Sequence, residues 1–189
     1  MKITDKNAFL VVPSIRRLND LDIALKSTRK VILLTDADIA NLKPLTEKVH
    51  AAGKKVWVNL ELLGGFGRDQ VGMKLLKNYY KVDGVMSTDN TRLRMARNAS
   101  LFTVQRFLIS DSRGLETAMR LMTSMKVDAA EILPASAAIE IFPELKGIVH
   151  VPVLAGGFVK TKKQVATLRE AGFAGITTSR PALWQMTTK

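Results

Sequence analysis

The chain contains no cysteine, two histidines and only 6% aromatic residues. The lack of cysteine excludes a disulfide framework, a zinc–thiolate site and a cysteine nucleophile. The histidines, His50 and His150, fall on an expected helix and just before an expected strand, and no lysine falls inside an expected strand. Neither histidine is placed for acid–base catalysis, and no lysine is placed to form a Schiff base. These absences favour a binding protein over an enzyme, and the scarcity of aromatics argues against a base-stacking reader of single strands.

Long apolar runs are also missing. None approaches the roughly 18 residues that a membrane span needs. The apolar run near the N-terminus ends at Pro13 and is too short for a signal peptide. We therefore expect a cytoplasmic protein with no membrane partner.

Basic residues are in large excess, with 29 Lys and Arg against 17 Asp and Glu and a net charge of +12. An excess of this size favours a polyanionic partner, with RNA or DNA first, although an ordinary solvated basic surface remains an alternative. Some cations precede the expected strands and would lie at the N-terminal rim of a barrel. The predicted RNA-binding candidates form two other groups: Arg92, Arg94, Arg97 and Arg113, and Lys160, Lys162 and Lys163.

Short apolar runs alternate with helical patterns along the whole chain. The expected strands cover residues 8–12, 31–34, 56–62, 84–86, 102–108 and 129–133, and two more end at 156–157 and 177–179. Among the helices, one over 69–79 would bury a stripe of Val71, Leu75, Leu76 and Tyr79. Eight such units predict an α/β fold, a compact (β/α)₈ barrel of parallel strands in one domain over residues 1–189. The chain is shorter than the typical ~250 residues, so some helices should be abbreviated. An open doubly wound sheet is the alternative fold.

The last two expected strands end in residues suited to an oxyanion. Gly156 and Gly157 lack a Cβ, so a ligand can approach their backbone closely. The neighbouring strand adds hydroxyls, and a short helix beginning at Pro181 would point its positive end at the same place. The predicted phosphate-binding set is Gly156, Gly157, Thr178, Ser179, Arg180 and Lys160.

Polar residues at the other strand ends form a predicted pocket for a small polyol phosphate: Arg16, Asn59, Glu61, Gln105, Arg106 and Glu131. Arg106 and Glu131 lie on consecutive strands, so we expect an ion pair, which could serve the barrel rather than a ligand. Asp36, Glu61 and Glu131 could instead hold Mg²⁺, but no close carboxylate pair appears in the sequence, and we predict neither a metal nor a cofactor.

Several motifs resemble the glycerol uptake operon antiterminator family. They are P-S-I-R at 13–16, G-V-M-S-T at 84–88, T-V-Q-R-F at 103–107, E-I-L-P at 131–134, A-G-G-F at 155–158 and T-T-S-R-P-A-L-W at 177–184. The resemblance implies a barrel-shaped regulator that responds to glycerol 3-phosphate and binds leader mRNA to prevent premature termination. It implies that Gly156, Gly157 and Ser179 hold the phosphate, with Arg16, Gln105, Arg106 and Glu131 in the pocket.

Four positions depart from the family pattern, namely Asn59, Glu61, Ala135 and Arg180, and they could alter the effector. The predicted function is a glycerol-3-phosphate-responsive, RNA-binding antiterminator of a glycerol-utilisation operon. The alternative is an enzyme of a small phosphate ester, an isomerase or lyase with Glu61 or Glu131 as its base. A homo-oligomer is left open.

Overall fold

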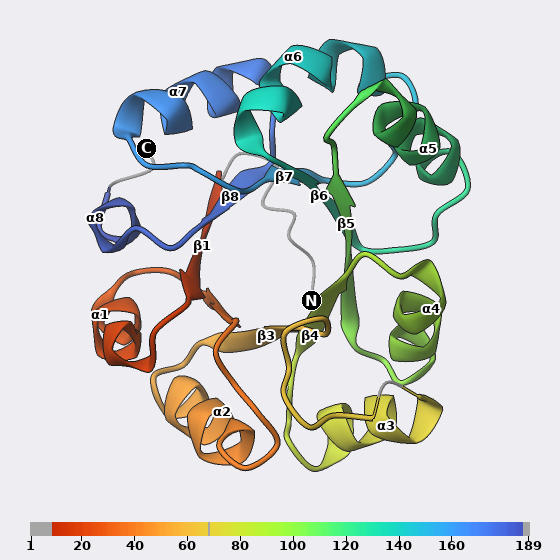
Figure 1. The fold of residues 1–189 in the computed structure, drawn as a ribbon. Helices are drawn as coiled ribbons and strands as arrows, with labels where there is room; N and C mark the ends of the chain where they lie inside the picture. The colour runs from red at the N-terminus through yellow and green to blue at the C-terminus, as the bar shows by residue number, and fades with distance from the viewer. Residues whose placement is uncertain (1–8, 68, 187–189) are drawn as a thin grey trace.

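A computed structural model describes residues 9–67 and 69–186. It contains a closed barrel of eight parallel strands in chain order, surrounded by helices (Figure 1). The strands are β1 (Leu10–Ile15), β2 (Val31–Leu34), β3 (Lys55–Asn59), β4 (Gly84–Ser87), β5 (Phe102–Leu108), β6 (Ala129–Leu133), β7 (Val153–Ala155) and β8 (Gly175–Thr178). The predicted (β/α)₈ fold is confirmed, and the doubly wound alternative is wrong because β8 pairs with β1 and closes the sheet.

Each strand is followed by a helix. A 3-10 turn (η1, Leu18–Asp20) precedes the first helix. The helices are α1 (Leu21–Lys26), α2 (Leu42–Ala51), α3 (Gln70–Asn78), α4 (Asn90–Asn98), α5 (Ser112–Met122), α6 (Ala135–Leu145), α7 (Lys162–Ala171) and α8 (Pro181–Trp184). As expected, two of them are short. Within the described residues, no helix is long and apolar enough to cross a membrane.

Two apolar layers stabilise the barrel. Inside it, strand residues such as Val12, Leu33 and Leu154 form one cluster, in which Trp57 stacks on Phe102 with ring centroids 5.1 Å apart. Between the strands and the helices, a second and larger cluster includes Val58 and Ile132. Because successive strand residues face opposite layers, the inward or outward direction of every polar residue at a strand end is set by its register.

Several strand ends differ from the sequence predictions, and those of β1 and β3 differ most. β1 continues past residue 12 to Ile15, because Ser14 and Ile15 pair with β2 although Pro13 has no N–H to donate. β3 ends at Asn59 and not at residue 62, because the Asn59 carbonyl accepts the N–H of Leu63 in a turn. β3 also begins at Lys55, so a lysine does lie in a strand, but it is exposed at the end opposite the candidate site.

The buried stripe predicted for α3 is wrong at three of its four residues. Leu76 is buried as predicted, but Val71, Leu75 and Tyr79 are exposed, and the helix buries Gly72 and Met73 in their place. Asp69 caps the helix by accepting the N–H of Gly72, and a Cβ at Gly72 would lie 1.9 Å from the Gly67 carbonyl oxygen. This close backbone approach turns the glycine face of α3 toward the protein and leaves Val71, Leu75 and Tyr79 outside.

Candidate functional site

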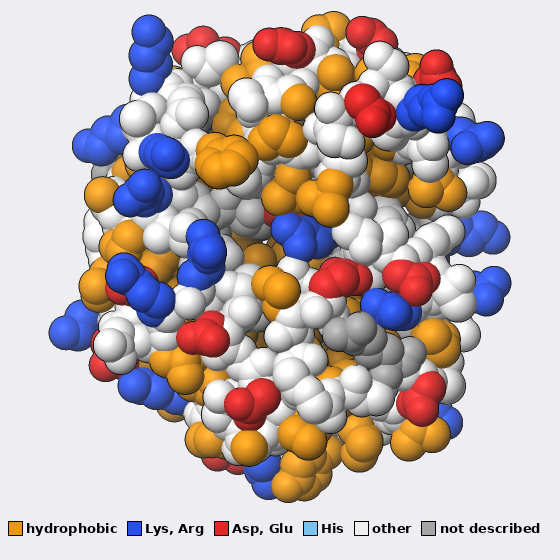
Figure 2. All heavy atoms as spheres, viewed as in Figure 1, with side chains coloured by type: hydrophobic (Ala, Val, Ile, Leu, Met, Phe, Trp, Pro, Cys, Tyr) orange, Lys and Arg blue, Asp and Glu red, His pale blue; other side chains and the backbone are white. Residues whose placement is uncertain are grey.

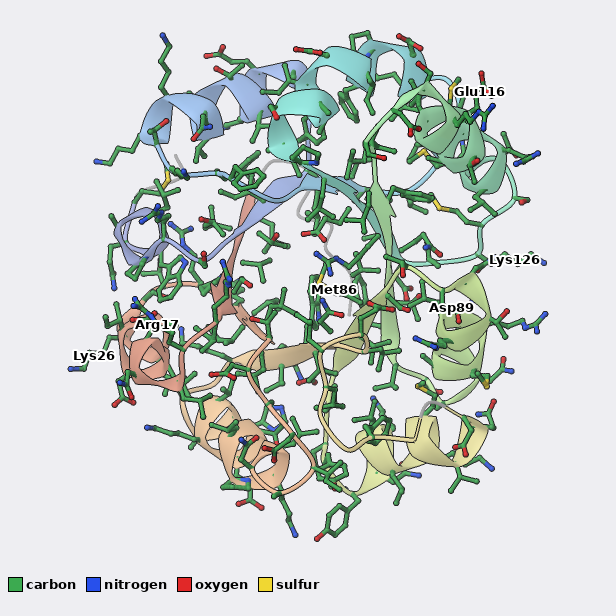
Figure 3. The ribbon with its side chains drawn as sticks, viewed as in Figure 1. Arg17, Lys26, Met86, Asp89, Glu116 and Lys126 are labelled. Carbon is green, nitrogen blue, oxygen red and sulfur yellow. The ribbon has the colours of Figure 1, made fainter. Side chains whose placement is uncertain are left out.

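The carboxyl ends of the eight strands meet on one face, where a barrel of this kind binds its ligands. Figure 2 views this face and shows blue Lys and Arg side chains around its rim and at its centre, with red acidic side chains beside the central group. Figure 3 places Met86 of β4 at the centre of the barrel in the same view. Polar residues beyond this apolar interior therefore form the floor of the candidate site.

A chain of three side chains crosses this floor. The Nε of Arg106 on β5 donates to Oε2 of Glu131 on β6 at 2.7 Å. The hydroxyl of Thr177 on β8 donates to the other carboxylate oxygen, Oε1, at 2.5 Å. Glu131 is completely buried, so the two donors compensate a charge that would otherwise be costly. The expected ion pair is present, and it connects β5 to β6 on the floor of the candidate site.

Thr177 is absent from the predicted phosphate-binding set, which includes the next three residues, Thr178, Ser179 and Arg180. Its neighbour Ile176 packs in the outer cluster, so alternation along β8 directs Thr177 into the barrel. The period-two alternation of β8 could have predicted that Thr177 faces inward. It could not have predicted its partner, because Glu131 lies 46 residues away in sequence.

The absence of a side chain at Gly156 makes room for the hydrogen-bonded side chains of Arg106, Glu131 and Thr177. A Cβ at Gly156 would lie 2.5 Å from Oε1 of Glu131 and 2.7 Å from the Thr177 hydroxyl. Its N–H already donates to the carbonyl of Ile132 at 3.0 Å. The glycine at this position is therefore required by the protein's own hydrogen bonds, whatever ligand binds above it.

The loop between β7 and α7 has an unusual backbone. Gly157 has φ +73° and Phe158 has φ +59°. This is the left-handed backbone conformation, which residues other than glycine rarely adopt. Gln164 holds the loop by donating from Nε2 to the Phe158 carbonyl and by accepting the N–H of Lys160. The side chain of Phe158 is left 73% exposed, and the Nζ of Lys160 lies 6.0 Å from its ring centroid. Such strain is typical of functional loops.

At the end of β8, the three predicted residues have different environments. The hydroxyl of Thr178 donates to the Val159 carbonyl at 2.9 Å and accepts the N–H of Arg180 at 3.2 Å, so it ties the two loops together. Ser179 is half-buried, and Arg180 is exposed. Ser179 and Arg180 are thus better placed than Thr178 to meet a ligand.

Asn59 and Glu61 lie at the β3 end of the face. The Oδ1 of Asn59 accepts the N–H of Glu61 at 2.9 Å, and Oε1 of Glu61 accepts the Ser87 hydroxyl at 2.5 Å. Glu61 also lies 3.8 Å from Nη1 of Arg92. It therefore connects β3 to β4 and the start of α4, and it does not join Glu131 and Asp36 in a metal-binding group.

Gln105 does not join the Arg106–Glu131 chain. Val104 is in the inner cluster, so alternation turns Gln105 to the outer side of β5. Its buried amide donates to the carbonyl of Thr88 at 2.9 Å, which ties the end of β5 to the loop after β4. Arg16, just after β1, is exposed on the same face as Arg180.

The basic residues predicted to bind RNA form two separate groups. Arg92 is engaged by Asp89, with Nε 3.2 Å from Oδ2, whereas Arg94, Arg97 and Arg113 are exposed. Asp89 also caps α4 by accepting the N–H groups of Thr91 and Arg92. Lys162 and Lys163 begin α7, across the barrel from α4 (Figure 1).

Comparison with known proteins agrees with the motif resemblance. A family model described as glycerol-3-phosphate responsive antiterminator matches residues 11–184. The glycerol uptake operon antiterminator regulatory protein of Listeria monocytogenes is 25% identical, with a TM-score of 0.86 over 94% of this chain and 96% of that chain.

Two further relatives are similar to this chain over nearly its whole length. An antiterminator-related protein of Thermotoga maritima is 24% identical and superposes with a TM-score of 0.81, covering 95% and 99% of the two chains. The Escherichia coli protein YgcP, described as uncharacterized, is 25% identical over 95% of this chain and 93% of its own length. The matched family is one of regulators, which confirms the prediction of a regulator over the enzyme alternative.

Proposed function

The chain belongs to the glycerol-3-phosphate responsive antiterminator family, and from this membership we propose that it binds glycerol 3-phosphate and leader RNA in the cytoplasm. In this proposal, the phosphate ester binds at the carboxyl ends of the strands. The RNA is the leader of a glycerol-utilisation operon, and effector binding changes the affinity for that RNA.

The observation that carries the effector site is the Arg106–Glu131–Thr177 chain beneath the loop of Gly157 and Phe158. Both oxygens of the buried carboxylate have donors, so its charge is compensated before an anion arrives. The exposed cations Arg16, Lys160 and Arg180 supply positive charge at the rim. The phosphate would lie near Gly157 and Ser179, and the glycerol hydroxyls would lie over Arg106 and Glu131.

Calorimetric titration tests the effector. We expect glycerol 3-phosphate to bind and to raise the melting temperature, and glycerol alone to do neither, because a ligand specific for the folded state stabilises it. Arg180→Gln should weaken binding about tenfold, since a charge-assisted hydrogen bond contributes roughly 1.5–3 kcal/mol. Lys146→Gln, which removes an exposed charge from the end of α6, is the control. No heat and no thermal shift at millimolar glycerol 3-phosphate would contradict this site.

The RNA component is supported by the net charge of +12 and by the exposed arginines of α4 and α5. Contacts to phosphates release counterions, so RNA affinity should fall steeply between 50 and 200 mM salt. The measurement is fluorescence anisotropy of a labelled leader transcript at both salt concentrations, with and without glycerol 3-phosphate. An affinity that is independent of salt and of the effector would show that the charge excess has another purpose.

A further inference from the structure

A groove of about 310 Å³ lies beside α5 and opens next to the effector face. Its apolar lining includes Phe107, Ile109 and Leu121, together with Leu108, which is 62% exposed. Polar lining comes from Thr88, Arg113 and Thr117. Leu108 and Arg113 therefore present an apolar and a cationic side chain at the same groove, which suits a ligand with both apolar and anionic groups.

The groove is on the side of α5 that faces α4. Leu93 and Ala96 bury the inner face of α4, and Gln70 of α3 donates to the Met95 carbonyl on one flank. Arg94 and Arg97 are three residues apart, so they share the opposite flank, toward the next helix of the ring. Figure 1 shows α4 and α5 as neighbours in that ring. Arg113 of α5 lines the groove, and Arg94 and Arg97 are exposed on the neighbouring helix α4.

These arginines are not neutralised within the protein. Among residues 9–67 and 69–186, Arg94, Arg97 and Arg113 form no ion pair, whereas Arg92 on the same helix is paired with Asp89. The acids at the starts of the two helices serve as caps, since Asp89 accepts N–H groups of α4 and Asp111 accepts the N–H of Gly114. The groove thus combines an apolar floor with Arg113 at its edge, and the exposed Arg94 and Arg97 lie on the next helix.

We propose that this groove is where the protein holds the RNA strand, with a nucleobase on the apolar floor and the flanking phosphates on Arg94, Arg97 and Arg113. The proposal rests on the proposed RNA-binding function and assigns its location. Guanidinium groups bind phosphates in a bidentate manner and stack on bases, so this mode needs no aromatic platform. A second copy of the chain is a poorer occupant, because it carries the same net charge of +12.

The position of the groove also explains how an effector could regulate RNA binding. Thr88 and Arg106 line the groove, and the amide of Gln105 joins the carbonyls of these two residues at 2.9 and 3.3 Å. Arg106 is at the same time the ion-pair partner of Glu131 in the effector site. A ligand that changes the position of Arg106 therefore acts on the end of β5, which forms one wall of the groove.

The test compares charge-matched triple variants in binding a fluorescein-labelled, mixed-sequence 20-nucleotide RNA. Arg94→Ala/Arg97→Ala/Arg113→Ala should weaken binding at least tenfold and reduce the slope of log affinity against log salt by about 2, or roughly 0.7 for each lost phosphate contact. The control Lys26→Ala/Lys30→Ala/Lys74→Ala removes the same charge from exposed positions elsewhere and should leave most of the affinity.

Leu108→Ala separates the contribution of the apolar floor to RNA affinity from the contribution of the arginine charges. It should weaken RNA binding several-fold without changing the salt slope, because it removes base contact and no charge. Circular dichroism and melting temperature verify that every variant is folded, and the substituted residues are all exposed.

Other outcomes overturn the proposal in distinguishable ways. If the groove triple binds like the wild type while Lys162→Ala/Lys163→Ala loses affinity, the RNA lies on α7 and the groove assignment is wrong. If the two triples weaken binding equally, only diffuse charge is involved, and the groove has no special role. If the wild-type protein binds neither the operon leader nor the 20-mer at 50 mM salt, the proposed RNA function itself fails. The effector titration is independent of all three results.

Discussion

Thr177 donates its hydroxyl hydrogen to Oε1 of Glu131 at 2.5 Å, across a space that exists because residue 156 has no side chain. Glu131 belongs to β6 and Thr177 to β8, so the bond passes over β7. The contact connects two strands that do not pair with each other, and it makes the floor of the effector site part of the barrel's own stabilisation.

Gly156→Ala should destabilise the protein. The new Cβ would lie within 3 Å of both Glu131 and Thr177, and overpacking of this kind costs about 1–3 kcal/mol. Urea denaturation measures the change in the free energy of unfolding. Gly147→Ala is the control, because a Cβ there would meet no atom within 4 Å. Equal urea midpoints for the two variants would show that Glu131 and Thr177 move aside for the new methyl group at little cost in free energy.

Glu131→Gln keeps the size of the side chain and an acceptor for Thr177, but it removes the charge that faces Arg106. We expect a loss of about 1–3 kcal/mol in the free energy of unfolding, because the guanidinium is largely buried and loses a charged acceptor. Adding Arg106→Met should cost less in the Glu131→Gln protein than in the wild type. Additive losses in this double-mutant cycle would mean that the ion pair contributes no coupling energy.

Asp83 makes stability depend on acid pH. Burial raises the pKa of Asp83, but the Val56 N–H and the His50 and Lys55 side chains outweigh it, so the pKa is lowered overall. A lowered carboxyl pKa stabilises the folded state above the unfolded value of about 3.9 and loses this effect as pH falls below it. Asp83→Asn should therefore be less stable at pH 7, and the difference from wild type should shrink as pH falls below 4. The measurement is urea denaturation at a series of pH values.

Asp22→Asn is the matched control for that series. The pKa of Asp22 is also lowered, by its hydrogen bond and charge interaction with Lys48, but the side chain is fully exposed. Solvent screens such a pair, so its stability profile should follow that of the wild type. If the Asp83→Asn profile stayed parallel to the wild type down to pH 2, the buried carboxylate would not be the titrating group.

Arg29 should control the opening of the C-terminal helix. Its side chain is buried and donates from Nε to the Trp184 carbonyl at 2.9 Å and from Nη2 to the Met186 carbonyl. Arg29→Met should raise amide hydrogen exchange in α8 roughly tenfold, which corresponds to about 1.4 kcal/mol of opening free energy. Arg17→Met, at an exposed position, should leave α8 unchanged. Protection retained in both variants would assign the anchoring to the Trp184 indole, which donates to the Thr178 carbonyl.

The sequence alone was sufficient to predict the barrel and which residues lie where its strands end. Continuous apolar runs that end in small or polar residues predict buried parallel strands, and chain order places the ends of β7 and β8 side by side. The Arg106–Glu131 pair followed from the same reasoning, because consecutive parallel strands are neighbours in this fold. The family motifs were also readable, since they are local runs of residues.

Only the tertiary structure decided what the individual residues do. The face of α3 that is buried depends on the approach of Gly72 to Gly67, and a helical period alone does not choose between two adjacent apolar stripes. Gln105 faces outward and Thr177 faces inward because the register of the closed barrel sets each direction. Gly156 has the pattern of a phosphate-binding glycine, yet its missing Cβ serves a bond between residues 46 positions apart. Contacts of that range depend on how eight strands close on one another, which no local pattern specifies.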